Sequence, residues 1–171
     1  MPHQILTSAK SAMLKEYKDH VEERLQQGIP PLPLNAEQVA DLVELLKSPP
    51  AGEEEFILDL IKNRTPAGVD PAAYVKAAFL TALAKGETSS PLIDKKLATE
   101  LLGTMLGGYN VESLIKLLKD EEVGAIAADG LSKTLLMFNA KHEVIELAAE
   151  NENAKRVVES WSNGEWFTSK S

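Results

Sequence analysis

The chain has 171 residues, 44% of them hydrophobic and 26% charged, a composition typical of a folded globular domain and not of a disordered or collagen-like chain. Its net charge of −8 is spread evenly along the sequence, which argues against a basic surface for nucleic acids. Cysteine is absent, which excludes disulfides, thiol catalysis and cysteine-held clusters for this sequence. No apolar run reaches the about 18 residues that a membrane span needs, which excludes membrane insertion.

The spacing of apolar residues predicts helices along nearly the whole chain. Capping signals precede several of them: Asn35 with Gln38 has the pattern of a capping box, and Asp70 and Ser90 each stand before a proline. Three prolines within 30–33 predict an extended connector. The expected helices cover residues 9–27, 36–47, 53–63, 71–85, 91–105, 111–119, 122–138, 141–149 and 152–161.

The helix over 71–85 shows how a buried face is predicted. Its apolar residues recur as pairs four positions apart, which places them on one side of a helix. The predicted inward stripe is Tyr74, Val75, Ala78, Phe79, Ala82 and Leu83, and Gly86 ends the helix.

The helices and their short joints predict an all-α fold. After the first helix they fall into four hairpins, and residues 42–47 (LVELLK) resemble residues 114–119 (LIKLLK) at an offset of 72. Two periods of about 36 residues are typical of stacked helix-pair repeats. The sequence therefore favours a short α-solenoid of about four helical hairpins with an extra N-terminal helix, and a globular helical bundle is the alternative.

Few residues in this sequence suggest chemistry. His142, Glu146 and Glu150 are spaced to share one helix face and could bind a metal, but such a set on an exposed helix is typically a solvated face, so we expect no metal site. The glycine-rich segment 103–108 lacks the Lys-Ser/Thr of a phosphate-binding loop and is interpreted as a helix end and turn. No nucleophile motif occurs, and we expect no catalytic residue and no bound cofactor.

Three aromatic residues near the C-terminus form the candidate interaction surface: Trp161, Trp166 and Phe167. In one interpretation they fold back and close the last helix pair. In the other they pack against a neighbour, because aromatic side chains are favoured anchors of protein interfaces. The residues alone leave both open.

Several longer strings of residues resemble one known family. They are PPAGEEEF (49–56), LDL (58–60), NR (63–64), GVD (68–70), AYVKA (73–77), ELLGTM (100–105), GGYN (107–110), LLMF (135–138) and EWF (165–167). Over residues 14–169 the chain resembles the N-terminal HEAT-like domain of the bacterial aconitate hydratase B (aconitase B) family. The resemblance implies a HEAT-like α-solenoid over 14–165, an N-terminal extension over 1–13 and a tail, 166–171, leading to a next domain.

The resemblance also implies a function. Enzymes of that family interconvert citrate and isocitrate through cis-aconitate in the tricarboxylic acid cycle, with a 4Fe-4S cluster held by cysteines of other domains. No catalytic position of the family falls on this chain. We therefore expect that this chain alone is not an enzyme. The implied role is non-catalytic protein interaction and control of active-site access, in the cytoplasm.

The expected partners are the remaining domains of an aconitase B or another protein, with a homodimer left open. We expect no membrane contact and no nucleic-acid binding. The alternative function is a free-standing helical-repeat adaptor that binds some other protein.

Overall fold

The structure, a computed structural model, describes residues 2–66, 68, 70–105, 109–133 and 138–162. Within these ranges, side chains are described from residue 12 to 133 and from 141 to 161. Over these residues it is entirely helical, which confirms the all-α class. The helices are α1 (Pro2–Gln26), α2 (Ala36–Lys47), α3 (Glu54–Asn63), α4 (Pro71–Lys85), α5 (Lys95–Gly103), α6 (Val111–Leu117), α7 (Gly124–Ser132), α8 (Phe138–Ala148) and α9 (Glu152–Ser162). None of these described helices has the length and apolar character required to cross a membrane.

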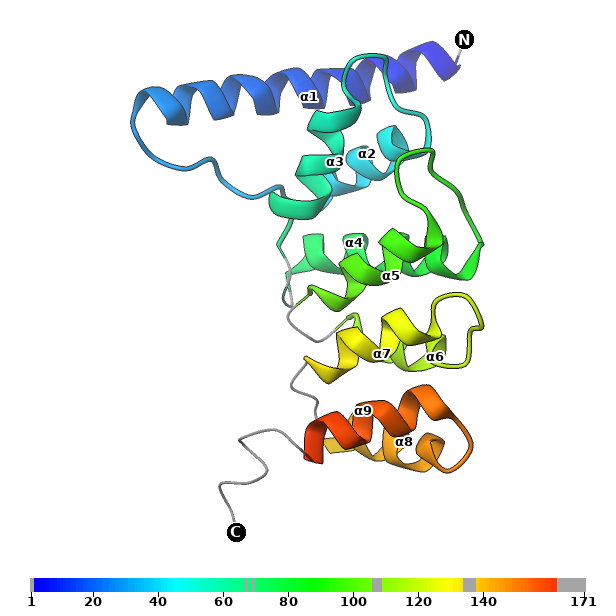
Figure 1. The fold of residues 1–171 in the computed structure, drawn as a ribbon. Helices are drawn as coiled ribbons and strands as arrows, with labels where there is room; N and C mark the ends of the chain where they lie inside the picture. Colours follow the sequence, from blue (N-terminus) through cyan, green and yellow to red (C-terminus); the bar gives the residue numbers. More distant parts are fainter. Residues whose placement is uncertain (1, 67, 69, 106–108, 134–137, 163–171) are drawn as a thin grey trace.

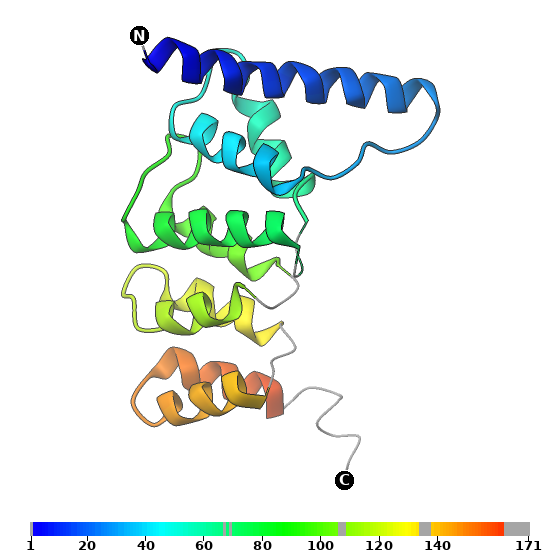
Figure 2. The ribbon, with the colours of Figure 1, turned by 180° about the vertical axis from the view of Figure 1, so that it is seen from behind.

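The helices after α1 form the four expected pairs, α2/α3, α4/α5, α6/α7 and α8/α9. The pairs stack in one column below α1 (Figure 1). Seen from behind, α2, α4, α6 and α8 lie one beneath the other as one layer (Figure 2), while α5, α7 and α9 pack on one another in the other layer. The core therefore runs continuously through the column between the two layers.

Local sequence signals fix several helix starts as predicted. Asn35 and Gln38 form the reciprocal capping box: the Asn35 side chain accepts from the Gln38 N–H, and the Gln38 side chain accepts from the Asn35 N–H, both at 2.9 Å. Asp70 Oδ1 accepts from the Ala72 N–H at 2.8 Å, ahead of α4. That helix ends at Gly86, whose φ of +79° is the left-handed conformation that glycine adopts without strain.

Two predicted helices are shorter than expected. The helix predicted over 91–105 begins only at Lys95, because Asp94 caps it by accepting from the Leu97 N–H at 2.7 Å. Ser90 is wrong as a cap; its Oγ instead donates to the Leu46 carbonyl at 2.6 Å and ties this loop to the end of α2. The helix predicted over 122–138 ends at Ser132, and Phe138 instead begins α8.

The inward stripe predicted for α4 is wrong by a rotation of the helix. Tyr74 is 58% exposed and Ala78 is also exposed, although both were expected inside. Apart from Phe79 and Leu83, the buried residues of α4 are Ala72, Ala73, Lys76, Ala77, Leu80 and Ala84. Because α4 carries apolar residues on nearly every side, its neighbours α5 and α2 decide which side is buried.

Side chains of α1 hold the proline-rich connector that follows it. The Tyr17 hydroxyl donates to the Leu32 carbonyl at 2.6 Å, and the Leu32 N–H donates to His20 Nε2 at 3.0 Å. Arg24 Nε donates to the Pro30 carbonyl at 2.9 Å. These bonds satisfy backbone groups that a proline-rich segment cannot pair within itself, so the connector is fixed along α1.

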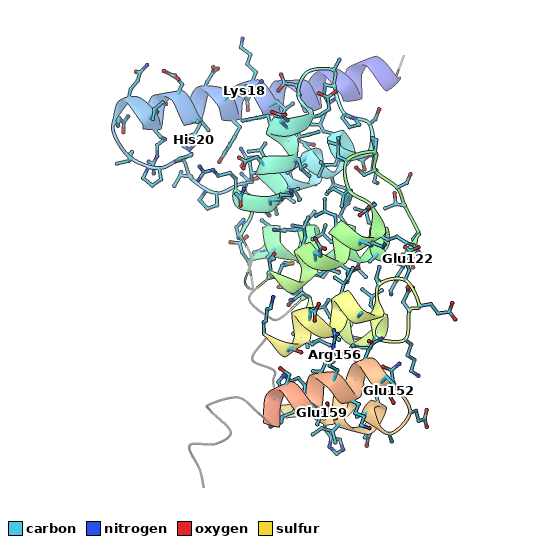
Figure 3. All side chains as sticks on the ribbon, viewed as in Figure 1. Lys18, His20, Glu122, Glu152, Arg156 and Glu159 are labelled. Carbon is cyan, nitrogen blue, oxygen red and sulfur yellow. The ribbon has the colours of Figure 1, made fainter. Side chains whose placement is uncertain are left out.

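Lys18, which lies on α1 near His20 in Figure 3, links α1 to α3. Its ammonium donates to both carboxylate oxygens of Glu53 at 2.6 Å and lies 4.9 Å from the centre of the Phe56 ring. Helix α1 is continuous through residues 13 and 14, and the division into an extension, 1–13, and a domain, 14–165, stays a prediction.

A pair of glycines brings α5 and α7 together. A Cβ placed on Gly130 would lie 2.8 Å from Cα of Gly103, and one placed on Gly103 would lie 3.0 Å from Cα of Gly130. Only the missing side chains permit this approach. Accordingly, α5, α7 and α9 pack closely, whereas α4, α6 and α8 in the other layer stand further apart.

We predict that Gly130→Ala destabilises the protein. The added methyl would overlap Gly103, and such overpacking costs about 1–3 kcal/mol of folding free energy. The higher helix propensity of alanine over glycine offsets roughly 1 kcal/mol of this cost. Urea melts would show the loss as a lower midpoint at unchanged slope.

Gly68→Ala is the matched control, because no atom lies within 4 Å of a Cβ at that position. It should be neutral or slightly stabilising. Equal stability of the two variants would contradict the close contact between α5 and α7.

Candidate functional site

Trp161 lies inside the protein and not on its surface. It stands near the end of α9, is 3% exposed, and its indole Nε1 donates to the Leu131 carbonyl of α7 at 3.3 Å. This is the packing that the fold-back interpretation describes for this residue. The other two candidate anchors, Trp166 and Phe167, lie outside the described residues.

Arg156 is a second link between α9 and α7 (Figure 3). Its guanidinium donates to the Ala125 carbonyl at 2.6 Å and to Asp129 Oδ1 at 2.8 Å. Both partners belong to α7, so the last helix pair is fastened to the preceding pair by Arg156 on the surface and by Trp161 inside.

Two of the three residues considered for a metal site, His142 and Glu146, contact each other on the surface. His142 Nε2 lies 3.1 Å from Glu146 Oε1, and both side chains are about two-thirds exposed or more, at 66% and 70%. Across the residues that the structure describes, no three His, Cys, Asp or Glu side chains are placed to hold one metal ion.

The glycine-rich segment that begins at Gly103 follows α5, and Asn110 closes the described part of this turn. Asn110 stands at the N-cap position of α6, but its side chain makes no capping bond there. Instead its amide donates to the Leu102 carbonyl at 2.7 Å and, more weakly, to the Met105 carbonyl at 3.4 Å. The buried amide thus satisfies the carbonyl end of α5.

The described surface has a groove between α4 and α6 that sequence reasoning missed. Tyr74 and Tyr109 stand at one end with their ring centres 5.1 Å apart and nearly perpendicular, and Tyr109 is 38% exposed. The small side chains of Ala77, Ala78 and Ala82 line it, leaving a volume of about 420 Å³. We call this the tyrosine groove.

Polar groups complete the tyrosine groove. Thr81 of α4 donates to Ser113 of α6 across it at 2.9 Å. Glu87 and Glu112 are the charged residues of its lining, and Glu112 also pairs with Lys116 at 3.0 Å. The groove therefore combines aromatic faces, hydroxyls and carboxylates, a set suited to binding and without an evident nucleophile. Two tyrosines in a chain with few aromatics were the available sequence signal.

A second groove lies between α6 and α8. It has about 460 Å³ and is lined by Ile115 and Leu147 together with side chains of both charges. The lysines are Lys116 of α6 and Lys119 just after it, and the glutamates are Glu143 and Glu146 of α8 and Glu150 just after it. Because the charges of its walls oppose one another, this groove has no clear preference for a charged ligand.

Beside the exposed Tyr74, α4 also carries a buried cation. Lys76 is 1% exposed, and no hydrogen bond or ion pair joins its ammonium to another described residue. Burial lowers the pKa of Lys76 from 10.5 to about 8. The loss of water around the ammonium is the cause, because desolvation penalises the charged form.

Comparison with known proteins gives one consistent result. A family model described as the aconitate B N-terminal domain matches residues 16–167. Among curated relatives, aconitate hydratase B of Pseudomonas aeruginosa is 63% identical over 159 residues, which is 92% of this chain and 18% of the relative.

Two further relatives carry the same name. Aconitate hydratase B of Escherichia coli is 60% identical over 91% of this chain, and that of Helicobacter pylori is 45% identical over 92%. In each case the match covers 18% of the relative, so the chain spans less than a fifth of the length of these proteins.

We predict that the stability of the protein rises with pH between about 8 and 10.5. In this range the unfolded chain keeps its proton on Lys76 while the folded chain releases it, so the free energy of unfolding increases, by up to about 3 kcal/mol. Below pH 8 the ammonium is charged in both states and the penalty is complete.

Lys76→Met should remove this dependence. Methionine fills a similar volume without charge, so the variant should be more stable at pH 7 by about 1–3 kcal/mol, and its stability should vary less above pH 8. Lys62→Met, on the exposed side of α3, is the control and should keep the rise. Denaturant melts at a series of pH values measure the free energy of unfolding of both variants. If the stability of Lys76→Met rises with pH above 8 as steeply as that of the unmodified protein, Lys76 is not the group responsible.

Proposed function

The chain belongs to the aconitate B N-terminal domain family, and on that basis we propose that it is a non-catalytic domain that binds the rest of an aconitate hydratase B and borders the access to its active site. The match of residues 16–167 to the family model supports this proposal. So does the coverage of 18% of the relatives' length, which leaves most of each relative outside the match.

The chemistry of the chain is the single observation that carries the non-catalytic part. An iron–sulfur cluster of the kind that the family resemblance implies is held by cysteine thiolates, and this sequence contains none. Nor does the described part of the chain offer an alternative group of three metal-ligating side chains. The residues of this chain therefore do not fit the cluster.

The arrangement of helices supports the binding part. Stacked helix pairs expose one layer along their whole length, and this layer is the surface that such proteins use for contacts. Here α4, α6 and α8 lie in one layer (Figure 2). Two grooves lie between them, one between α4 and α6 and one between α6 and α8. A domain of this form binds through surface complementarity and influences catalysis only through its position.

We predict no aconitate hydratase activity for the purified chain. After incubation with iron and sulfide, the ultraviolet absorbance of cis-aconitate should not rise above that of a mock preparation. The intact Pseudomonas aeruginosa enzyme, treated in the same way, is the positive control. Turnover by the chain alone would contradict the proposal.

The binding part is tested in a full-length chimera in which this chain replaces the matching region of the Pseudomonas aeruginosa enzyme. We predict that Trp166→Ser with Phe167→Ser loosens the contact between this domain and the rest, because aromatic anchors dominate many interfaces. Relative to the unmodified chimera, hydrogen–deuterium exchange along α9 should increase and kcat/KM for citrate should change. The iron content of the two proteins should be the same, which shows that the cluster is retained.

Trp161→Phe is the comparison variant, because Trp161 is buried within this domain and its replacement should leave the contact to the rest intact. Identical exchange and kinetics in the double variant and the unmodified chimera would contradict the role of Trp166 and Phe167. If the isolated chain and the chimera also show the same exchange everywhere, the alternative of a free-standing adaptor is favoured.

A further inference from the structure

We propose that the tyrosine groove between α4 and α6 binds an arginine side chain presented by the remaining part of the aconitate hydratase B polypeptide. This inference rests on the proposed function and adds the place and the chemistry of one contact. It is carried by the exposed tyrosines, by the charge of the groove and by the small side chains of its wall.

The tyrosines provide the first argument. Tyr74 is 58% exposed and Tyr109 38%, although large aromatic side chains gain most from burial. Their nearly perpendicular rings, 5.1 Å apart, present a ring face and a ring edge at the same end of the groove. A cation placed over such a face is attracted by its negative quadrupole, and arginine makes this contact more often than lysine.

The polar lining provides the second argument. The charged residues of this groove, Glu87 and Glu112, are both carboxylates, and the oxygens of Thr81 and Ser113 keep lone pairs beside their mutual bond. These groups accept hydrogen bonds, and a guanidinium has five donors and no acceptor. Lys116 pairs with Glu112, whereas no hydrogen bond or ion pair joins the Glu87 carboxylate to another described residue. One carboxylate is therefore available to a cation.

The wall of the groove provides the third argument. Ala77, Ala78 and Ala82 are small enough to leave about 420 Å³, which admits the flat guanidinium and its methylene stem. The neighbouring groove between α6 and α8 has similar volume, but its lining contains no aromatic ring and places Lys116 and Lys119 beside its glutamates, so it has no clear preference for a cation. The comparison assigns the cationic ligand to the tyrosine groove.

The source of the arginine follows from the length of the relatives. The match covers 18% of each aconitate hydratase B, so more than four-fifths of such a polypeptide is at hand for contact with this domain. A segment of the same polypeptide has a high effective concentration, and a modest contact therefore suffices to hold it.

The chemistry is tested on the isolated chain with a defined probe. The tripeptide acetyl-Gly-Arg-Gly-amide is titrated against the chain while the tyrosine ring signals are followed by NMR. We expect saturable shifts at Tyr74 and Tyr109 with a Kd of about 1–10 mM, a magnitude typical of a single charged anchor. The same tripeptide with citrulline, which keeps the shape without the charge, should bind at least about fivefold more weakly.

Matched substitutions locate the site. Tyr74→Ser and Glu87→Gln should each weaken the binding of the arginine tripeptide by at least about threefold, because each removes one charge-sensitive contact. Leu25→Ser and Glu37→Gln, both exposed and distant from the groove, are the controls and should leave it unchanged. Equal binding of the arginine and citrulline tripeptides, or equal loss in the controls, would overturn the proposed chemistry.

The source is tested in the full-length chimera. Peptides that cover α4 and α6 should exchange hydrogen more slowly in the chimera than in the isolated chain, and Tyr74→Ser should abolish that difference. If the isolated chain binds the arginine tripeptide but α4 and α6 gain no protection in the chimera, the assignment to the same polypeptide is overturned. Protection elsewhere in the domain would still support the proposed function, so the two failures are distinguishable.

Discussion

The contact between Gly103 and Gly130 is the constraint on which the shape of this domain depends. With no side chains between them, the backbones of α5 and α7 touch, and the layer that contains α9 packs closely along the column. In the other layer, α4, α6 and α8 stand further apart. The grooves between α4 and α6 and between α6 and α8 are the result of this asymmetry.

The burial of one charged residue in the column has an electrostatic consequence. Where α4 is enclosed by α2 and α5, Lys76 loses its water without gaining a partner among the described residues, which lowers its pKa to about 8. On the opposite side of the same helix, Tyr74 is left in solvent. One rotational setting of α4 therefore produces both an energetic cost inside and a binding surface outside. Functional surfaces often carry such local departures from the usual distribution of residues.

At the other end of the column, α1 buries Met13, Leu14 and Tyr17 in the core and is also joined by polar contacts. Tyr17, His20 and Arg24 bind the backbone of the connector, and Lys18 pairs with Glu53. Burial raises the pKa of the Tyr17 hydroxyl, with a smaller opposing influence from Arg64. At the lower end, Trp161 and Arg156 hold α9 to α7. Both ends are thus secured by hydrogen bonds from side chains to the backbone and by ion pairs, in addition to apolar packing.

The sequence by itself determined the all-α class, the order of the helices, their pairing, and local features such as the capping box at Asn35 and the ends of α4 at Asp70 and Gly86. These follow from interactions between residues a few positions apart, which the sequence displays directly. Only the tertiary structure decided which side of α4 is buried, why Gly103 is a glycine, and that Asn110 serves the end of α5. It also brought Tyr74 and Tyr109 together, 35 positions apart in the sequence. The physical reason is that a helix with apolar residues all round has no preferred face of its own, and the helices packed against it choose one.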